Sequence, residues 1–183
     1  MLHFDIDWQD LLRIGEELQA SDKQIKFALS RALRRTEASL RKLSSKGLPK
    51  VLGLRVATAL RKRLRSIKLR ATPGSDGVAL WYGLNPLPVS SFKGRIQQDD
   101  GGAWKKDYYF DDAFVAKSSK KGQNTIFKRK GKDRLPIVEQ SITIEDAAFV
   151  YIEDEVFEQT LDIFWRHFMR DLKARVKFQI GER

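Results

Sequence analysis

The sequence contains no cysteine and only two histidines. The absence of cysteine excludes a disulfide-stabilised scaffold, a thiolate metal site and a cysteine nucleophile. His3 and His167 lie far apart in the sequence, which argues against a zinc centre. We therefore expect a protein that holds no metal ion and no other cofactor.

Patterns typical of enzymes and of membrane proteins are also missing. Neither GxGxxG nor GxxxxGK[ST], the glycine-rich phosphate-binding patterns, occurs, and no serine lies in GxSxG. No apolar run approaches the ~20 residues of a membrane-spanning helix. The first ten residues, MLHFDIDWQD, are acidic and lack the order of a signal peptide. We expect a soluble, cytoplasmic chain that is not an enzyme and makes no membrane contact.

Clustered carboxylates come nearest to a catalytic or metal-binding pattern. The clusters are Asp99-Asp100, Asp111-Asp112 and Glu153-Asp154-Glu155. Such groups can bind a cation or exchange protons with a substrate. They can equally be solvated acids in loops and at the start of a helix. We favour the second interpretation.

What the sequence does contain is a core-forming composition and an uneven charge. The chain has 183 residues, of which 42% are hydrophobic, and this suits a single domain. The net charge is +11 at pH 7. Residues 1–22 and 145–162 are acidic, whereas residues 23–70 and 117–134 are basic. Oppositely charged faces suit head-to-tail self-association as well as binding to an anionic polymer.

Hydrophobic periodicity predicts a helical part over residues 1–65. The predicted elements are a short strand at 2–7, a short helix at 8–20, a helix from Ser21 or Asp22 to Gly47, and a helix from Pro49 to about Leu64. The last two helices are basic. They form either an antiparallel pair with solvated faces or a surface for sequence-independent nucleic-acid binding. They do not match the compact recognition helix of a helix-turn-helix.

Over residues 66–143 the apolar period changes to two, which predicts an antiparallel sheet. The predicted strand pairs are 67–71 with 78–82, joined by a turn at 73–77, and 109–116 with 125–130. Residues 87–106 show little periodicity and are predicted to form a long loop. Of the adjacent aromatics Trp81 and Tyr82, one is expected to face the core, although both could stack on bases.

Residues 144–183 predict one long amphipathic helix. Its first turns are acidic and its last turns are basic, which complements the helix dipole. We expect its apolar face to pack on the sheet. The predicted fold is therefore a single α+β domain with N-terminal helices, an antiparallel sheet with long loops, and a closing helix.

A basic hairpin is predicted immediately before that last helix. Its basic side chains are Lys128, Arg129, Lys130, Lys132 and Arg134. Gly131 indicates the turn, because glycine adopts positive φ without steric cost. Leu135, Pro136 and Ile137 follow. Proline cannot donate to a strand ladder, so Pro136 is expected on an edge strand or at the start of a strand.

The order of these pieces resembles the minor tail protein Z family of long-tailed phages and prophages, over about residues 20–180. The resemblance rests on the phrase FKRKGKDRLPI at residues 127–137 before a terminal helix. It also rests on the strand end that contains Tyr82, Gly83, Asn85 and Pro86. The first twenty residues and residues 99–107 carry no such resemblance.

The resemblance implies a structural virion protein that completes the tail at its head-proximal end. Its partners would be other tail or neck proteins and further copies of itself, in a ring such as a hexamer. It would be assembled in the cytoplasm of the bacterial host and reside in the virion tail. The basic hairpin would face either a protein partner or a channel through which DNA passes, where it would contact phosphates without reading sequence.

Overall fold

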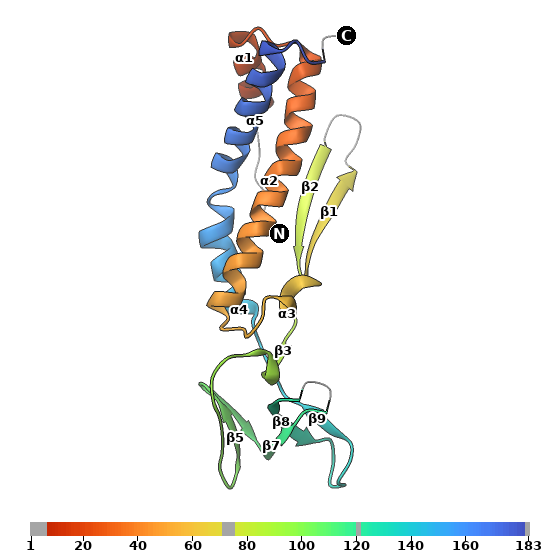
Figure 1. Cartoon of the computed structure of the whole chain (residues 1–183), viewed down its shortest axis with the longest axis vertical. Helices are drawn as coiled ribbons and strands as arrows, with labels where there is room; N and C mark the ends of the chain where they lie inside the picture. Colours follow the sequence, from red (N-terminus) through yellow and green to blue (C-terminus); the bar gives the residue numbers. More distant parts are fainter. Residues whose placement is uncertain (1–6, 71–75, 120–121, 182–183) are drawn as a thin grey trace. The chain divides into compact units, whose positions relative to one another are not determined.

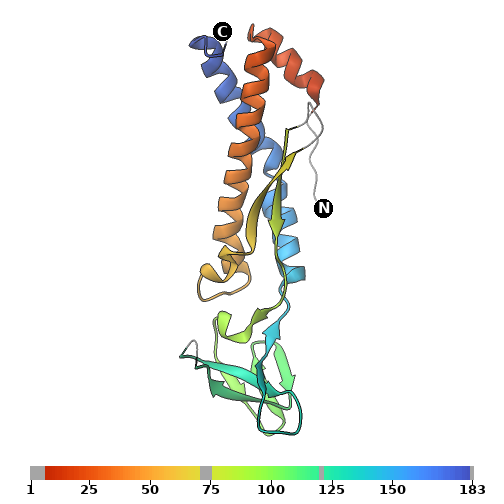
Figure 2. The same cartoon turned by 90° about the vertical axis from the view of Figure 1, so that its right-hand side faces the viewer.

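The computed structural model describes residues 7–70, 76–119 and 122–181 (Figures 1 and 2). It contains long helices and several small antiparallel sheets, so the α+β class is confirmed. The chain forms two compact units. Unit 1 consists of 1–45, 64–82 and 151–183, and unit 2 consists of 46–63 and 83–150. These boundaries differ from the divisions expected at residues 65 and 143.

Unit 1 is built mainly from helices. The helical elements that begin or lie in it are α1 (Trp8–Glu17), α2 (Asp22–Val51), the π-helical turn η2 (Ile152–Phe157) and α5 (Thr160–Lys177). The predicted short helix is confirmed as α1, and the Asp7 carboxylate caps it by accepting from the Gln9 N–H at 2.8 Å. The strand expected at 2–7 lies outside the described residues, except for Asp7.

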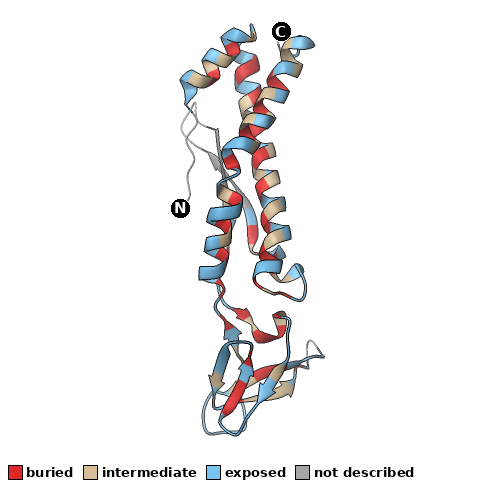
Figure 3. Cartoon of the chain, turned by 90° about the vertical axis from the view of Figure 1, so that its left-hand side faces the viewer, coloured by how far each residue is buried: buried red, intermediate tan, exposed pale blue. Residues whose placement is uncertain are grey.

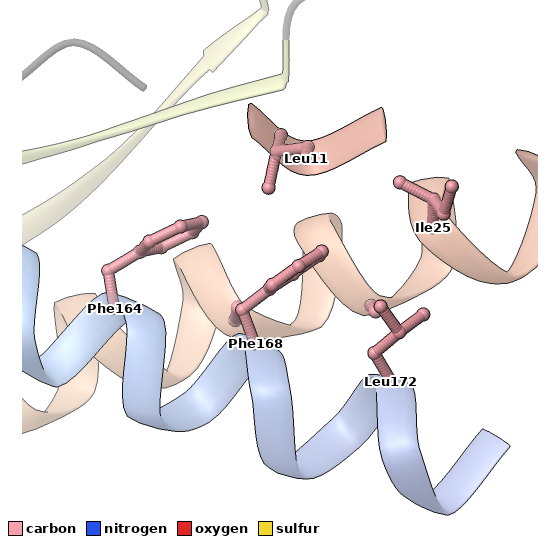
Figure 4. Packing of buried hydrophobic residues seen from close by; sticks show 7 residues of the cluster. Leu11, Ile25, Phe164, Phe168 and Leu172 are labelled. Atoms are coloured by element: carbon pink, nitrogen blue, oxygen red, sulfur yellow. The ribbon is translucent and has the colours of Figure 1, made fainter. Parts of the chain in front are cut away.

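A hydrophobic core joins the three longest helices of unit 1. Leu11 of α1, Ile25 of α2, and Phe164, Phe168 and Leu172 of α5 point toward one another (Figure 4). Figure 3 shows the buried positions on the facing sides of these helices and the exposed positions on the outside. Gly15 lets α1 approach α2, because a Cβ there would lie 2.2 Å from the Ile25 side chain.

The closing helix was expected on the sheet, and this detail was wrong. Its apolar face packs against α1 and α2. The reason lies in two small residues of α2, Ala28 and Ala32, which are fully buried and leave room for the rings of Phe164 and Phe168. The helical run itself was predicted, and it comprises α4 (Glu145–Tyr151), η2 and α5.

Helix α2 does not end at Gly47 as expected. It continues through Gly47 and Pro49 to Val51, because Leu48 and Leu52, one turn apart, are both buried. The helix is stopped just beyond Val51 by Gly53, which lies at φ +63°. There the Gly53 N–H donates to the Lys50 carbonyl at 3.1 Å and the Leu54 N–H to the Pro49 carbonyl at 2.8 Å. The helix expected from Pro49 to Leu64 is therefore reduced to α3 (Thr58–Arg61).

The first predicted hairpin is confirmed. Strand β1 (Leu64–Arg70) pairs antiparallel with β2 (Asp76–Tyr82), with Ser66 opposite Leu80. Of the turn expected at 73–77, residues 73–75 lie outside the described part. The hairpin lies beside α2 (Figures 1 and 2), and the Tyr82 hydroxyl bonds the Ser44 hydroxyl of α2 at 2.8 Å.

The described residues of unit 2 form three small sheets, where one sheet was expected. Its strands are β3 (Leu87–Pro88), β4 (Ile96–Gln98), β5 (Gly102–Lys105), β6 (Tyr108–Asp111), β7 (Ala113–Lys117), β8 (Asn124–Arg129), β9 (Ile137–Glu139) and β10 (Ser141–Ile142), with the short 3₁₀ turn η1 (Val89–Ser91) after β3. The strand orders are β10-β3, β4-β5-β6 and β7-β8-β9. The predicted pairing of 109–116 with 125–130 is confirmed for β7 and β8, but a positive φ at Asp112 separates β6 from β7.

The long loop expected at 87–106 is also wrong, because it contains β3, β4 and β5. Asp99 creates the turn between β4 and β5: its Oδ1 accepts from the N–H groups of Gly101 at 3.0 Å and Gly102 at 2.7 Å. Its Oδ2 accepts from the Trp104 indole at 2.9 Å. These hydrogen bonds lower the pKa of Asp99, the bond from Trp104 most. Asp99 thus acts as a turn residue.

Candidate interaction surface

The basic hairpin is formed by β8 and β9, at one edge of the β7-β8-β9 sheet of unit 2 (Figure 1). Lys128 lies opposite Val138, and Arg129 lies opposite Ile137. The Lys130 N–H donates to the Pro136 carbonyl at 3.0 Å and closes the loop of residues 130–136. The chain reverses around Gly131 as expected, but Gly131 does not adopt the positive φ on which that prediction was based. Pro136 lies directly before the edge strand β9, as predicted.

Two of the five basic side chains rest on the neighbouring strands. The Lys128 ammonium donates to the Asp111 carbonyl at 2.9 Å, and the Arg129 guanidinium lies 5.9 Å from the centroid of the Phe114 ring. Lys130, Lys132 and Arg134 are exposed in the loop. The structure thus brings all five predicted basic residues onto one hairpin, and three of them project from its tip.

Apolar side chains accompany this positive charge. Leu135 is 68% exposed, Val138 50% and Ile137 37%. Val138 and Ile137 belong to β9, which is an edge strand of its sheet. An edge strand offers backbone groups for pairing with another chain, and exposed apolar groups beside it favour such contact. The hairpin therefore combines a charged tip with an apolar edge.

The base of the hairpin is fixed by Glu139, which the sequence did not single out. Its Oε1 accepts from the Thr125 hydroxyl at 2.8 Å and from the Ser90 N–H at 3.2 Å. Thr125 and Ile126 beside it are fully buried. The carboxylate thus ties β8, β9 and η1 together. A glutamate between two apolar stretches resembles any surface acid in sequence, so no local signal marked it.

The second predicted motif, Tyr82 to Pro86, serves the fold. Tyr82 bonds Ser44 in unit 1, and burial raises the pKa of its hydroxyl. In unit 2, the Gly83 N–H donates to the Arg63 carbonyl at 2.8 Å. The Arg63 guanidinium donates in turn to the carbonyls of Asn85 and Pro86. Trp81 is 45% exposed whereas Tyr82 is half-buried, as expected for an alternating strand.

An acidic segment in unit 1 has the opposite character. Glu153, Asp154, Glu155 and Glu158 are all exposed on and just after η2, and Leu161 beyond them is 46% exposed.

No group of three or more metal-ligating side chains occurs in the part of the chain that the structure describes. Across the same residues, no helix is long and apolar enough to cross a membrane.

Lys105 of β5 is an unexpected buried cation. It is fully buried, and its ammonium donates to the Gly94 carbonyl at 2.6 Å. Burial lowers the pKa of Lys105, and the charges of Arg55 and Lys106 lower it further. Lysine is seldom fully buried in proteins, so its burial at this position was not predicted from sequence.

Replacing Lys105 by methionine is expected to remove a pH-dependent part of the stability. Because the pKa of Lys105 is lowered in the folded chain, the unfolded chain binds more protons between that value and about 10.4. The free energy of unfolding of the wild type should therefore rise with pH across this window, and that of Lys105→Met should lack this rise. Urea unfolding at a series of pH values measures the difference.

Lys132→Met is the matched control, because it removes an exposed lysine from the hairpin tip. Its pH dependence should follow that of the wild type. If the free energy of unfolding changed with pH in the same way for the wild type and Lys105→Met, burial of the Lys105 amine would not make stability depend on pH.

None of the known protein families, curated proteins or solved structures compared with this chain matches it.

Proposed function

We propose that this protein is a structural component of a phage virion, a minor tail or tail-completion protein that acts at the head-proximal end of the tail during tail assembly. The observation that carries the proposal is the β8–β9 hairpin, with its basic tip and its exposed apolar edge strand. Residues 127–137, which carry the resemblance to the minor tail protein Z family, are the same hairpin. A protein partner, in the virion or during assembly in the host cytoplasm, would cover this surface.

A second copy of the chain supplies the complementary surface. The hairpin tip carries Lys130, Lys132 and Arg134, and the acidic segment carries Glu153, Asp154, Glu155 and Glu158. Each surface is accompanied by exposed apolar groups, Leu135 on the first and Leu161 on the second. Contact between different surfaces on two copies is heterologous, and it closes into a ring when the rotation between copies allows. Other tail or neck proteins would then stack on that ring.

Reversing the five hairpin charges to glutamate is expected to abolish self-association while the monomer stays folded. Like charges placed opposite each other across an interface cost several kcal/mol, so the association constant should fall at least about a hundredfold. Sedimentation measures association, and circular dichroism measures folding. Loss of folded structure in the variant would show that the hairpin is needed for the fold itself.

A charge exchange identifies the partner surface. Replacing Glu153, Asp154, Glu155 and Glu158 by lysine should also abolish self-association, because two basic surfaces then face each other. The chain that carries both sets of replacements should regain it. An equimolar mixture of the two single-surface variants should regain it as well. If neither combination restores association, the acidic segment is not the surface that the hairpin contacts, and a self-assembled ring of this type is excluded.

A further inference from the structure

One face of helix α2 in unit 1 is lined by cations over several turns. Two adjoining hollows that share Ala38 lie along it. The larger hollow, of about 490 Å³, is lined by Phe27, Arg31, Arg34 and Arg35 of α2 and by Arg175 of α5. Arg41 and Lys42 line the smaller one, together with Glu37. These positions recur every three or four residues, which places them on one side of the helix.

A buried carboxylate arranges the guanidinium groups of the larger hollow. Asp171 of α5 is 8% exposed. Its Oδ2 lies 2.7 Å from Nε of Arg175, and its Oδ1 lies 3.3 Å from Nε of Arg31 and 3.8 Å from a terminal nitrogen of Arg35. One acid thus holds three arginines from two helices, which limits the conformational freedom that a ligand would otherwise have to remove.

The hollow keeps a strong excess of positive charge. Asp171 offsets one of its four guanidinium groups, and none of the described residues that line the hollow is acidic. His167 lies one turn before Asp171 on the same side of α5, and the nearby positive charges affect its pKa. Its pKa is lowered first by burial and then by the arginines at 170, 35 and 166. Geometry and electrostatics therefore both indicate a site for an anion.

An aromatic ring lies at the end of this face. Phe27 is 47% exposed, and the Arg175 guanidinium lies 5.3 Å from the centroid of its ring. Phe27 is the exposed large apolar residue of the face. A protein interface has a core depleted of charge, whereas nucleic-acid interfaces are strongly basic and polar. The composition of this face therefore matches a nucleic acid better than an acidic protein.

We propose that the α2 face, defined by Arg31, Arg34, Arg35, Arg41, Lys42 and Arg175, binds the phosphodiester backbone of duplex DNA. Arg31 and Lys42 are eleven residues apart, about 17 Å along a helix. One strand of a duplex carries about five phosphates over that distance. Guanidinium groups bind phosphate oxygens in pairs and read no base, so binding is independent of sequence. The site lies apart from the β8–β9 hairpin in the chain and does not depend on the proposed tail function.

The test compares duplex binding by the wild type and by Arg34→Gln/Arg41→Gln/Lys42→Gln. These three side chains are exposed, and the arginines that contact Asp171 are left in place. Fluorescence anisotropy with a short labelled duplex, at several salt concentrations, should show at least about tenfold weaker binding by the variant. The slope of log K against log salt should fall by about 2 to 3, since each phosphate contact contributes about 0.9.

The control removes the same charge from the hairpin, as Lys130→Gln/Lys132→Gln/Arg134→Gln. It should bind duplex within about threefold of the wild type. Equal losses in the two variants would mean that net charge alone retains DNA, which overturns the proposal. So would unchanged binding by the α2 variant, or a wild type that does not bind duplex at physiological salt. Loss of self-association in the α2 variant, with duplex binding intact, would instead make this face a protein interface.

Discussion

Replacing Phe168 by alanine is expected to lower the free energy of unfolding of unit 1 by about 3–5 kcal/mol. Phe168 is fully buried. The centroid of its ring lies 5.9 Å from that of the stacked Phe164 ring and 5.8 Å from that of the Trp165 ring, which is oriented edge-on to it. Removing the ring leaves a cavity that the packed helices α1, α2 and α5 cannot fill without moving. Urea unfolding followed by circular dichroism measures the loss.

Phe178→Ala is the control for this prediction. Phe178 follows the same helix, but it is 65% exposed and contacts the Lys177 ammonium at 5.4 Å from its ring centroid. Its replacement should cost no more than about 0.5–1 kcal/mol. Similar losses at both positions would mean that the α1-α2-α5 cluster is not the core that stabilises unit 1.

Asp171→Asn should lower the free energy of unfolding by about 2–3 kcal/mol. The replacement keeps the shape of the side chain but removes the charge on which Arg31, Arg35 and Arg175 converge. Hydrogen bonds to charged groups contribute about 1.5–3 kcal/mol, and unpairing a buried charge costs more. The exposed ends of Arg31 and Arg35 keep the cost below that of a fully buried cluster. Urea unfolding measures it.

A second carboxylate tests whether position or chemistry causes that loss. Asp10 also pairs with an arginine, Arg13, at 3.1 Å, but both side chains are largely exposed. Asp10→Asn should therefore cost about 0–1 kcal/mol. If Asp171→Asn cost as little, the three guanidinium groups would not depend on the carboxylate, and the arranged cation cluster of the α2 face would lose its support.

Local patterns predicted much of the fold, and contacts distant in sequence account for the errors. The hairpin of β1 and β2, the pairing of β7 with β8 and the helical run of residues 145–177 follow from apolar periods that a short window contains. The end of α2 cannot be predicted from such a local pattern. Gly47 and Gly53 are equally suitable stop signals in sequence, and the burial of Leu48 and Leu52 selects the second. Strands of two to four residues, such as β3 to β5, are too short to show a period.

The same distinction applies to the candidate surfaces. The basic hairpin was predicted because its residues are consecutive in sequence. The basic helix was predicted as either a solvated face or a nucleic-acid-binding surface. Its ion-pair cluster was not predicted, because Asp171 and Arg175 join Arg31 and Arg35 from the opposite end of the chain. Lys105 and Glu139 were missed because their burial and their partners depend on tertiary packing.

The base and the loop of the hairpin have different roles. Glu139 fixes the base to the rest of unit 2, whereas the loop of residues 130–136 is the part proposed to contact a partner. The bonds from Thr125 and Ser90 fix the base, and the backbone bond from the Lys130 N–H to the Pro136 carbonyl closes the loop. Residues 131–135 are all exposed, so substitutions there are expected to cost little stability. The sequence of such a loop can change independently of the sheet. Substitutions there can change which partner the hairpin binds, while the sheet that carries the hairpin keeps its structure.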